Sequence, residues 1–159
     1  MVIPSSVVDH AYLAGIVDGE GCIIIRHQGG RKGTANGYAL ELNITNTDEA
    51  LMIWLLDTFG GLCRWKVKKG LTGLMKRPSW VWWVSGKNAG AVLQVILPYL
   101  RVKRAQADLG LRFLSHGTGR GFLTGRGARL DPKFLAERAT MKTHMQLLKA
   151  PRVATGSGQ

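Results

Sequence analysis

The sequence contains few cysteines and no long apolar segment, and these absences narrow the class of protein. Only Cys22 and Cys63 occur among 159 residues. Two cysteines far apart in the sequence argue against a disulfide framework and form no C-x-x-C zinc motif. We interpret both as small core or sheet residues. No apolar run approaches the roughly 20 residues that a membrane span needs, and no basic segment typical of a signal peptide precedes the first apolar residues. We therefore expect an intracellular protein without a membrane partner, while cytoplasm, nucleoid and organelle stay open.

Acidic residues are also scarce, and their scarcity leaves a strong positive charge. Ten Asp and Glu stand against 22 Lys and Arg, so the net charge is +12 and the isoelectric point is about 10.3. This charge is suited to binding a nucleic acid or an anionic membrane surface. Alternatively, it belongs to a basic surface that contacts only solvent. The charges spread over predicted strands and loops rather than along one amphipathic helix, which disfavours the membrane. Despite 21 glycines, no G-x-x-x-x-G-K-[ST] phosphate loop occurs.

The hydrophobic pattern predicts one α+β domain over residues 1–150 and a disordered tail over 151–159. Apolar residues alternate with polar ones in four segments, which is typical of half-buried strands. Capping residues and terminal glycines delimit the helices between them, with Thr47 as the expected cap of the second helix. The predicted elements are a helix at 6–18, strands at 22–27 and 38–45, a helix from 47 to 60, strands at 62–69 and 79–85, and helices at 88–100, 103–114 and 131–149. This order predicts a four-stranded antiparallel sheet with helices on one face.

The other face of the predicted sheet carries cations and amides, and basic loops flank it. A two-stranded ribbon fits the major groove of DNA, where Arg pairs with guanine and Asn with adenine, while loop cations reach phosphates. A plain solvated sheet face remains the alternative, and Trp83 is expected to rest on the protein surface. The predicted DNA-binding residues are Ile24, Arg26, Gln28, Arg31, Lys32, Glu41, Asn43, Arg64, Lys66, Lys68, Lys76, Arg77, Ser79 and Val81.

Small residues crowd the first helix, in the stretch LAGIVDGEG at 13–21. Glycine in a helix costs roughly 1 kcal/mol relative to alanine, so close packing against another helix must offset it. Small residues four positions apart allow such an approach, and no second copy of the stretch exists in this chain. We therefore predict a two-fold dimer whose interface contains Ala11, Ala14, Gly15, Asp18 and Gly19.

Such a dimer would bring two Glu20 carboxylates together at the end of the paired helices. Two carboxylates held close repel each other unless a proton or a cation lies between them. Magnesium binds a few carboxylates together with waters and phosphate oxygens, and a basic sheet beside the site would deliver phosphate. Metal-assisted hydrolysis of a phosphodiester is the chemistry that this arrangement predicts.

The segment YLAGIVDGEG at 12–21 closely resembles the signature motif of LAGLIDADG homing endonucleases. The segments PYLRVKRAQA at 98–107 and DPKFLAERATMK at 131–142 resemble later parts of the single-motif, homodimeric members. This resemblance implies an αββαββα fold and a homodimer that cleaves a long pseudo-palindromic site in double-stranded DNA with Mg2+ or Mn2+. An intron RNA maturase, or a non-catalytic DNA-binding protein on the same fold, is the alternative.

The resemblance also assigns roles to individual residues. It implies that Glu20 and the Gly19 carbonyl bind metal, that Lys103 supports water activation or transition-state charge, and that Asn46 orders water near the metal. Lys103 could equally be a surface lysine and Asn46 a turn residue, while Asp18 is expected to brace a helix junction. At Ala50 the chain departs from relatives that carry a basic residue.

Overall fold

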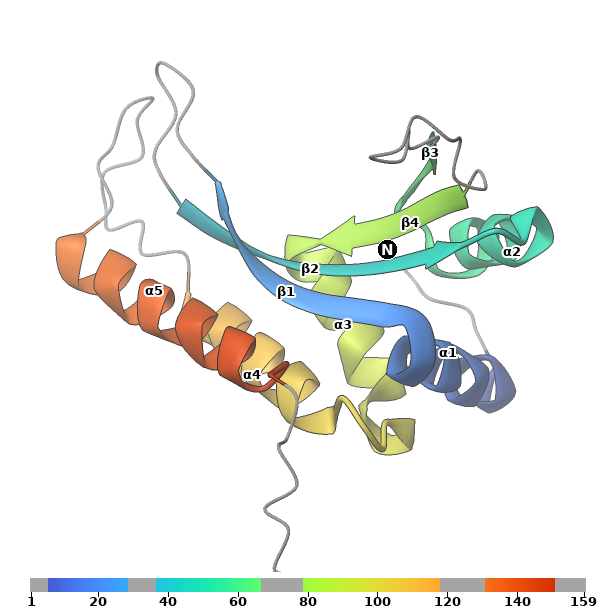
Figure 1. Ribbon diagram of the computed structural model, residues 1–159. Helices are drawn as coiled ribbons and strands as arrows, with labels where there is room; N and C mark the ends of the chain where they lie inside the picture. The colour runs from blue at the N-terminus through green and yellow to red at the C-terminus, as the bar shows by residue number, and fades with distance from the viewer. Residues whose placement is uncertain (1–5, 29–36, 67–78, 118–130, 151–159) are drawn as a thin grey trace, which may run out of the picture.

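A computed structural model describes residues 6–28, 37–66, 79–117 and 131–150. Five α-helices, one short 3-10 helix and four strands make up this part of the chain (Figure 1). They are α1 (Val7–Glu20), β1 (Gly21–Gln28), β2 (Gly37–Asn46), α2 (Glu49–Phe59), β3 (Leu62–Lys66), β4 (Ser79–Ser85), α3 (Gly86–Ile96), η1 (Leu97–Tyr99), α4 (Arg104–Ser115) and α5 (Pro132–Leu147). The strands form one antiparallel sheet in the order β1-β2-β4-β3, which confirms the predicted α+β class. Within the described residues no helix is both long and apolar enough to span a bilayer.

The core lies between one face of the curved sheet and the helices packed against it (Figure 1). Leu40, Leu42 and Ile44 of β2 are fully buried on this face, as their alternation predicts. Trp82 and Val84 of β4 join them, and the Trp82 indole donates a hydrogen bond of 2.7 Å to the Gly60 carbonyl. We call the opposite face, which no described helix covers, the open face.

One prediction at the far side of the sheet needs correction, and one residue there is more exposed than its face suggests. The cap of α2 is Asp48 rather than Thr47, since the Asp48 carboxylate accepts from the Leu51 N–H at 2.9 Å. Trp65 lies opposite Trp80 on the covered face, but it is 46% exposed because β3 is an edge strand, and its ring packs edge-on against Trp80. The predicted end of this strand at 67–69 and the tail at 151–159 lie outside the described residues.

Helix α1 passes into strand β1 without a loop, and this junction positions the candidate site. Ser6 and Asp9 form a capping box at the start of α1, which runs to Glu20, two residues beyond the predicted end. Gly21 follows directly as the first residue of β1. A Cβ atom at Gly21 would lie 2.7 Å from the Cα atom and 2.8 Å from the carbonyl oxygen of Val17. The sharp junction therefore requires a residue without a side chain.

Substitution of Gly21 should reveal this close approach. We expect Gly21→Ala to lower the free energy of unfolding by about 1–3 kcal/mol, since the new methyl group collides with backbone atoms that cannot move independently. Urea denaturation measures the loss. The matched control is Gly19→Ala, where the added Cβ would meet no described atom of the same protomer within 4 Å. Measured at a protein concentration low enough to keep the protomer monomeric, its stability should rise by up to about 1 kcal/mol. Equal stability of the two variants would contradict the steric argument.

Helix α5 is attached through a buried arginine that the sequence pattern did not single out. Arg138 is 7% exposed and its guanidinium lies 4.0 Å from the ring centre of Phe113. It donates hydrogen bonds to the carbonyl oxygens of Tyr38, Phe113 and Gly117. These contacts link α5 to β2 and to the end of α4, beside the sheet edge formed by β1.

Candidate active site

The Glu20 carboxylate is exposed at the last residue of α1 and is held by one side chain. The Asn46 amide, at the last residue of β2, donates a hydrogen bond of 2.6 Å to Glu20 Oε2. The Asn46 side-chain oxygen Oδ1 in turn accepts from the Asp48 backbone N–H at 3.0 Å. Asn46 therefore makes the local turn contact that one interpretation expected, and its side-chain amide also holds the Glu20 carboxylate. Its predicted role in ordering water near a metal stays a prediction.

A reciprocal set of hydrogen bonds joins the end of α1 to the start of α4. The Asp18 carboxylate accepts from the backbone N–H groups of Arg101, Val102 and Lys103 at 2.7, 3.2 and 2.9 Å. The Lys103 ammonium donates to the carbonyl oxygens of Val17 and Asp18 at 2.8 and 2.7 Å. An anion thus lies at the N-terminal end of α4 and a cation at the C-terminal end of α1, the favourable placement for both helix dipoles.

This contact set changes the acidity of Asp18. Burial is the largest single influence and would raise its pKa, but the N–H groups of Arg101, Lys103 and Val102, together with the Lys103 charge, outweigh burial and lower the pKa below 3.8. A carboxyl whose pKa is lower in the folded state stabilises the fold at every pH above its ordinary pKa. That contribution disappears as the pH falls through the lowered folded value.

Removal of the Asp18 charge should therefore destabilise the protein in a pH-dependent way. We expect Asp18→Asn to lower the free energy of unfolding by about 2 kcal/mol at pH 7, because backbone N–H groups lose acceptors. The difference from the wild type should shrink as the pH falls below about 4, where the wild-type carboxyl itself becomes protonated. Urea denaturation between pH 3 and pH 7 measures both values. A difference that does not change with pH would show that the charge of Asp18 is unimportant.

The candidate metal ligands that the structure describes at the end of α1 are oxygen donors. Glu20 offers a carboxylate and Gly19 a backbone carbonyl, and such hard donors suit Mg2+ or Mn2+ completed by waters and phosphate oxygens. Among the described residues, no three His, Cys, Asp or Glu side chains come together as a metal site. One carboxylate and one carbonyl are too few to enclose an ion within a single protomer, but their chemistry is compatible with the predicted divalent cation.

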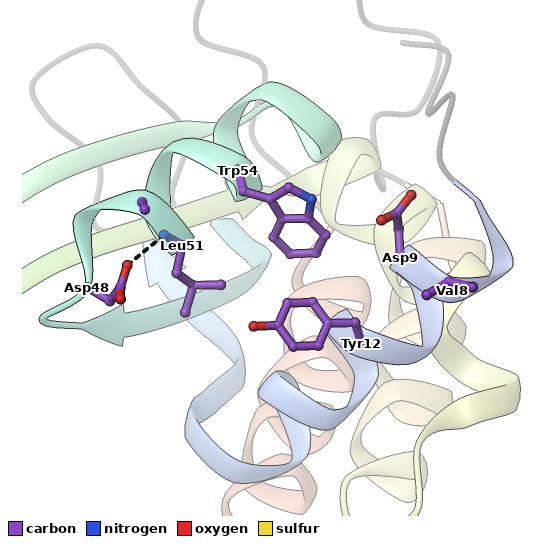
Figure 2. A pocket seen from close by; sticks show the side chains of 7 residues that line it. Val8, Asp9, Tyr12, Asp48, Leu51 and Trp54 are labelled. Carbon is purple, nitrogen blue, oxygen red and sulfur yellow. Dashed lines mark hydrogen bonds between the residues drawn. The ribbon is translucent and has the colours of Figure 1, made fainter.

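Ala50 lies in a pocket of about 380 Å3 between α1 and α2 (Figure 2). The Tyr12 and Trp54 rings line this pocket and contact each other edge-on, with their centres 5.1 Å apart. The remaining lining residues are Val8, Asp9, Asp48 and Leu51. A cation at position 50 is what the sequence resemblance leads one to expect, but Ala50 contributes only a methyl group and none of the other lining side chains carries positive charge.

The exposed face of α1 differs in part from the predicted dimer surface. Ala11, Gly15 and Gly19 are exposed, and a Cβ added at either glycine would meet no described atom within 4 Å beyond the surrounding helix backbone. The prediction for Ala14 is wrong, because Ala14 is fully buried in the core of its own protomer. Asp18 likewise directs its carboxylate to residues 101–103 of its own chain.

Two apolar residues extend the exposed face of α1 beyond the predicted set. Val8 is 75% exposed and Tyr12 55% exposed, and with Gly15 and Gly19 they follow a spacing of four, three and four residues. This spacing places them on one side of the helix. Val8 and Tyr12 could not be singled out from the spacing of small residues, which is the only sequence signal of close helix packing in this stretch.

The open face carries most of the predicted DNA-binding residues that the structure describes. Arg26, Gln28 and Arg64 are exposed, while Ile24, Glu41, Asn43 and Ser79 are half-buried. Val81 is only 8% exposed, so its prediction as a contact residue needs correction. It lies on the inner strand β4, flanked by Thr45 and Arg64. Arg31, Lys32, Lys68, Lys76, Arg77 and the side chain of Lys66 lie outside the described part.

Two arginines on the open face have partners from neighbouring strands. Arg26 Nε donates a hydrogen bond of 2.8 Å to Glu41 Oε2. The Arg64 guanidinium carbon lies 5.2 Å from the ring centre of Trp83, within the range of cation–π attraction. Trp83 thus rests on the protein surface beneath an arginine, in agreement with its expected position.

Comparison with known proteins supports the fold assignment. No family model and no curated protein sequence matches the chain. The homing endonuclease I-CvuI, solved in complex with the I-CreI target and Mg, superposes with a TM-score of 0.65 at 24% identity over 93% of this chain and 86% of its own. The archaeal intron-encoded homing endonuclease I-Vdi141I, complexed with DNA, gives a TM-score of 0.63 at 14% identity over 89% and 84% of the two chains.

A third similar structure carries the family name itself. The LAGLIDADG homing endonuclease I-GzeII, in complex with its DNA target, gives a TM-score of 0.62 at 16% identity over 87% of this chain and 45% of its own. These three proteins were solved in complex with DNA. The strand order, the α1–β1 junction and this similarity lead to one conclusion: the polypeptide has the LAGLIDADG homing-endonuclease fold, built around a single copy of the motif.

Proposed function

We propose that this protein is a site-specific endonuclease that hydrolyses double-stranded DNA with a divalent metal ion, as a homodimer. The observation that carries the proposal is the Glu20 carboxylate, exposed at the end of α1 and held by Asn46 at 2.6 Å. In the same fold, proteins described as homing endonucleases are bound to DNA targets. The charge of +12 adds a general attraction for a polyanion.

Residues at and beside the end of α1 would have separate roles in the reaction. Glu20 and the Gly19 carbonyl would hold Mg2+ or Mn2+, which when bound stabilises negative charge on the attacking and leaving oxygens of the phosphodiester. Asn46 keeps the Glu20 carboxylate in one orientation and limits the rearrangement needed on binding. Lys103 places a positive charge beside the last turn of α1, where its ammonium already contacts the Val17 and Asp18 carbonyls.

Features of α1 that one protomer does not explain support the proposed dimer. Gly15 and Gly19 weaken the helix by roughly 1 kcal/mol each, yet nothing in the protomer would obstruct a side chain at either position. Val8 and Tyr12 leave apolar surface exposed beside them. A second α1 helix packed along this side would bury the apolar surface, use the glycines for close approach, and bring two copies of Glu20 together.

Selection from a random DNA library tests the proposed function. The full-length protein is incubated with the library and Mg2+, and cleaved molecules are captured and sequenced. We expect enrichment of one long, pseudo-palindromic site, because two identical protomers would each bind one half-site. A parallel reaction with a metal chelator should yield no cleaved product. Cleavage that continues with the chelator, or fragments without a shared sequence, would contradict the proposal.

A further inference from the structure

The open face of the sheet distributes its charged residues by strand. The two outer strands carry the exposed arginines, Arg26 on β1 and Arg64 on β3, whereas the inner strands carry their partners, Glu41 on β2 and Trp83 on β4. In both cases the partner is the diagonal neighbour across the strand pair.

The geometry of the two pairs is the same. Arg26 lies directly opposite Ala39, and Glu41 is two residues further along β2. Arg64 lies directly opposite Val81, and Trp83 is two residues further along β4. Neither direct neighbour carries a polar side chain, so each arginine turns to its diagonal neighbour. Because both strand pairs are antiparallel, both side chains lean toward the start of their own strand.

In the Arg26–Glu41 pair, the acidic side chain is mostly covered and the basic side chain is exposed. The Arg26 side chain is 56% exposed and the Glu41 side chain 14%. Glu41 occupies the Nε donor, one of the five N–H donors that a guanidinium presents in a fixed fork. A carboxylate facing DNA directly would repel phosphate, whereas a carboxylate covered by an arginine mainly fixes the direction of that arginine.

We propose that Glu41 and Trp83 are positioning residues that aim Arg26 and Arg64 at guanines in the target, so that the inner strands set sequence specificity through the outer ones. This inference rests on the proposed function. Arginine loses many rotamers when it binds, and a side chain already held in one direction loses fewer. Arginine pairs with guanine through two parallel hydrogen bonds, which demands a defined direction of the guanidinium plane.

A double-mutant cycle on DNA preference tests the first pair. Binding of the full-length protein is measured by fluorescence anisotropy on duplexes of the selected site, each with one base pair changed. We expect Arg26→Ala to lose about tenfold of discrimination at its base pair. Glu41→Gln should lose several-fold at that same base pair, while binding to an unrelated duplex stays equal or becomes tighter because a negative charge is removed. In the Arg26→Ala background, Glu41→Gln should change the preference no further.

The second pair and a matched control complete the experiment. Trp83→Leu should reproduce the preference change of Arg64→Ala in weaker form. Asp57→Asn removes an exposed carboxylate from α2 and should leave every preference unchanged. Three results would contradict the inference: a Glu41→Gln effect at a different base pair, an effect of Glu41→Gln that persists in the Arg26→Ala background, or an equal loss of binding affinity on all duplexes. If the wild type shows no sequence preference, the proposed function also fails. A preference unchanged by Glu41→Gln overturns only this inference.

Discussion

Glu20→Gln should abolish DNA cleavage and leave DNA binding nearly intact. The amide keeps the size of the side chain but removes the negative charge that a divalent cation requires. Metal stabilisation of the transition state is worth several kcal/mol, so the cleavage rate should fall by about a thousandfold. Binding should persist because the open face and its arginines, rather than Glu20, would make the DNA contacts. Single-turnover cleavage and fluorescence anisotropy on the selected site measure the two effects separately.

A glutamate on another helix provides the control for this variant. Glu137 lies on α5, where it pairs with His116 at 3.3 Å, and Glu137→Gln should cleave at the wild-type rate. Parallel loss of binding and cleavage in Glu20→Gln would argue that Glu20 supports the structure instead of holding the metal. Wild-type cleavage by Glu20→Gln would exclude this carboxylate from the reaction altogether.

Gly15→Leu should convert the dimer into monomers and remove cleavage with it. Two-fold symmetry places two leucines in one interface, each forcing apart backbones that meet at glycine. Overpacking costs typically 1–3 kcal/mol at each site, so the dissociation constant of the dimer should rise by about a hundredfold or more. The protomer itself should fold normally, since a Cβ at Gly15 meets no atom within 4 Å. Light scattering of the purified protein reports the mass, and circular dichroism reports the fold.

Ala136→Leu tests whether an added leucine on any helix surface has the same effect. Ala136 is exposed on α5, and its substitution should leave both the mass and the cleavage rate unchanged. If Gly15→Leu keeps the mass of a dimer, the exposed side of α1 is not the interface. If it becomes monomeric yet still cuts both strands at the wild-type rate, the shared Glu20 site is wrong.

Periodic patterns explain why so much of the fold could be predicted from the sequence. Alternation in β2 placed Leu40, Leu42 and Ile44 in the core because successive side chains in a strand must point to opposite faces. Gly60 and Gly61 ended α2 as expected, and both have a positive φ, which favours glycine. The cap of α2 could not be chosen from sequence, because Thr47 and Asp48 are adjacent and both can accept the first N–H groups.

The residues of α1 show where a local pattern becomes insufficient. Ala11 and Ala14 are equally small and lie close together in the sequence, but the core covers only Ala14. Which side of a helix faces its own sheet depends on the packing of the whole domain, and a stretch with small residues around most of its circumference carries little information about it. The wrong prediction for Ala14 follows from that ambiguity.

The sequence by itself determined the fold class, the helix and strand order, the basic character of the surface and the motif that ends in Glu20, since each depends on residue type and spacing along the chain. Only the tertiary structure decided which side chains meet. Asn46 reaches Glu20 because the β1–β2 register pairs Gly21 with Ile44. Asp18 reaches residues 101–103 because α1 and α4 meet end to end. These contacts join residues that are 26 and 85 positions apart in the sequence. They depend on strand register and on helix placement, which the alternation of apolar residues alone does not determine.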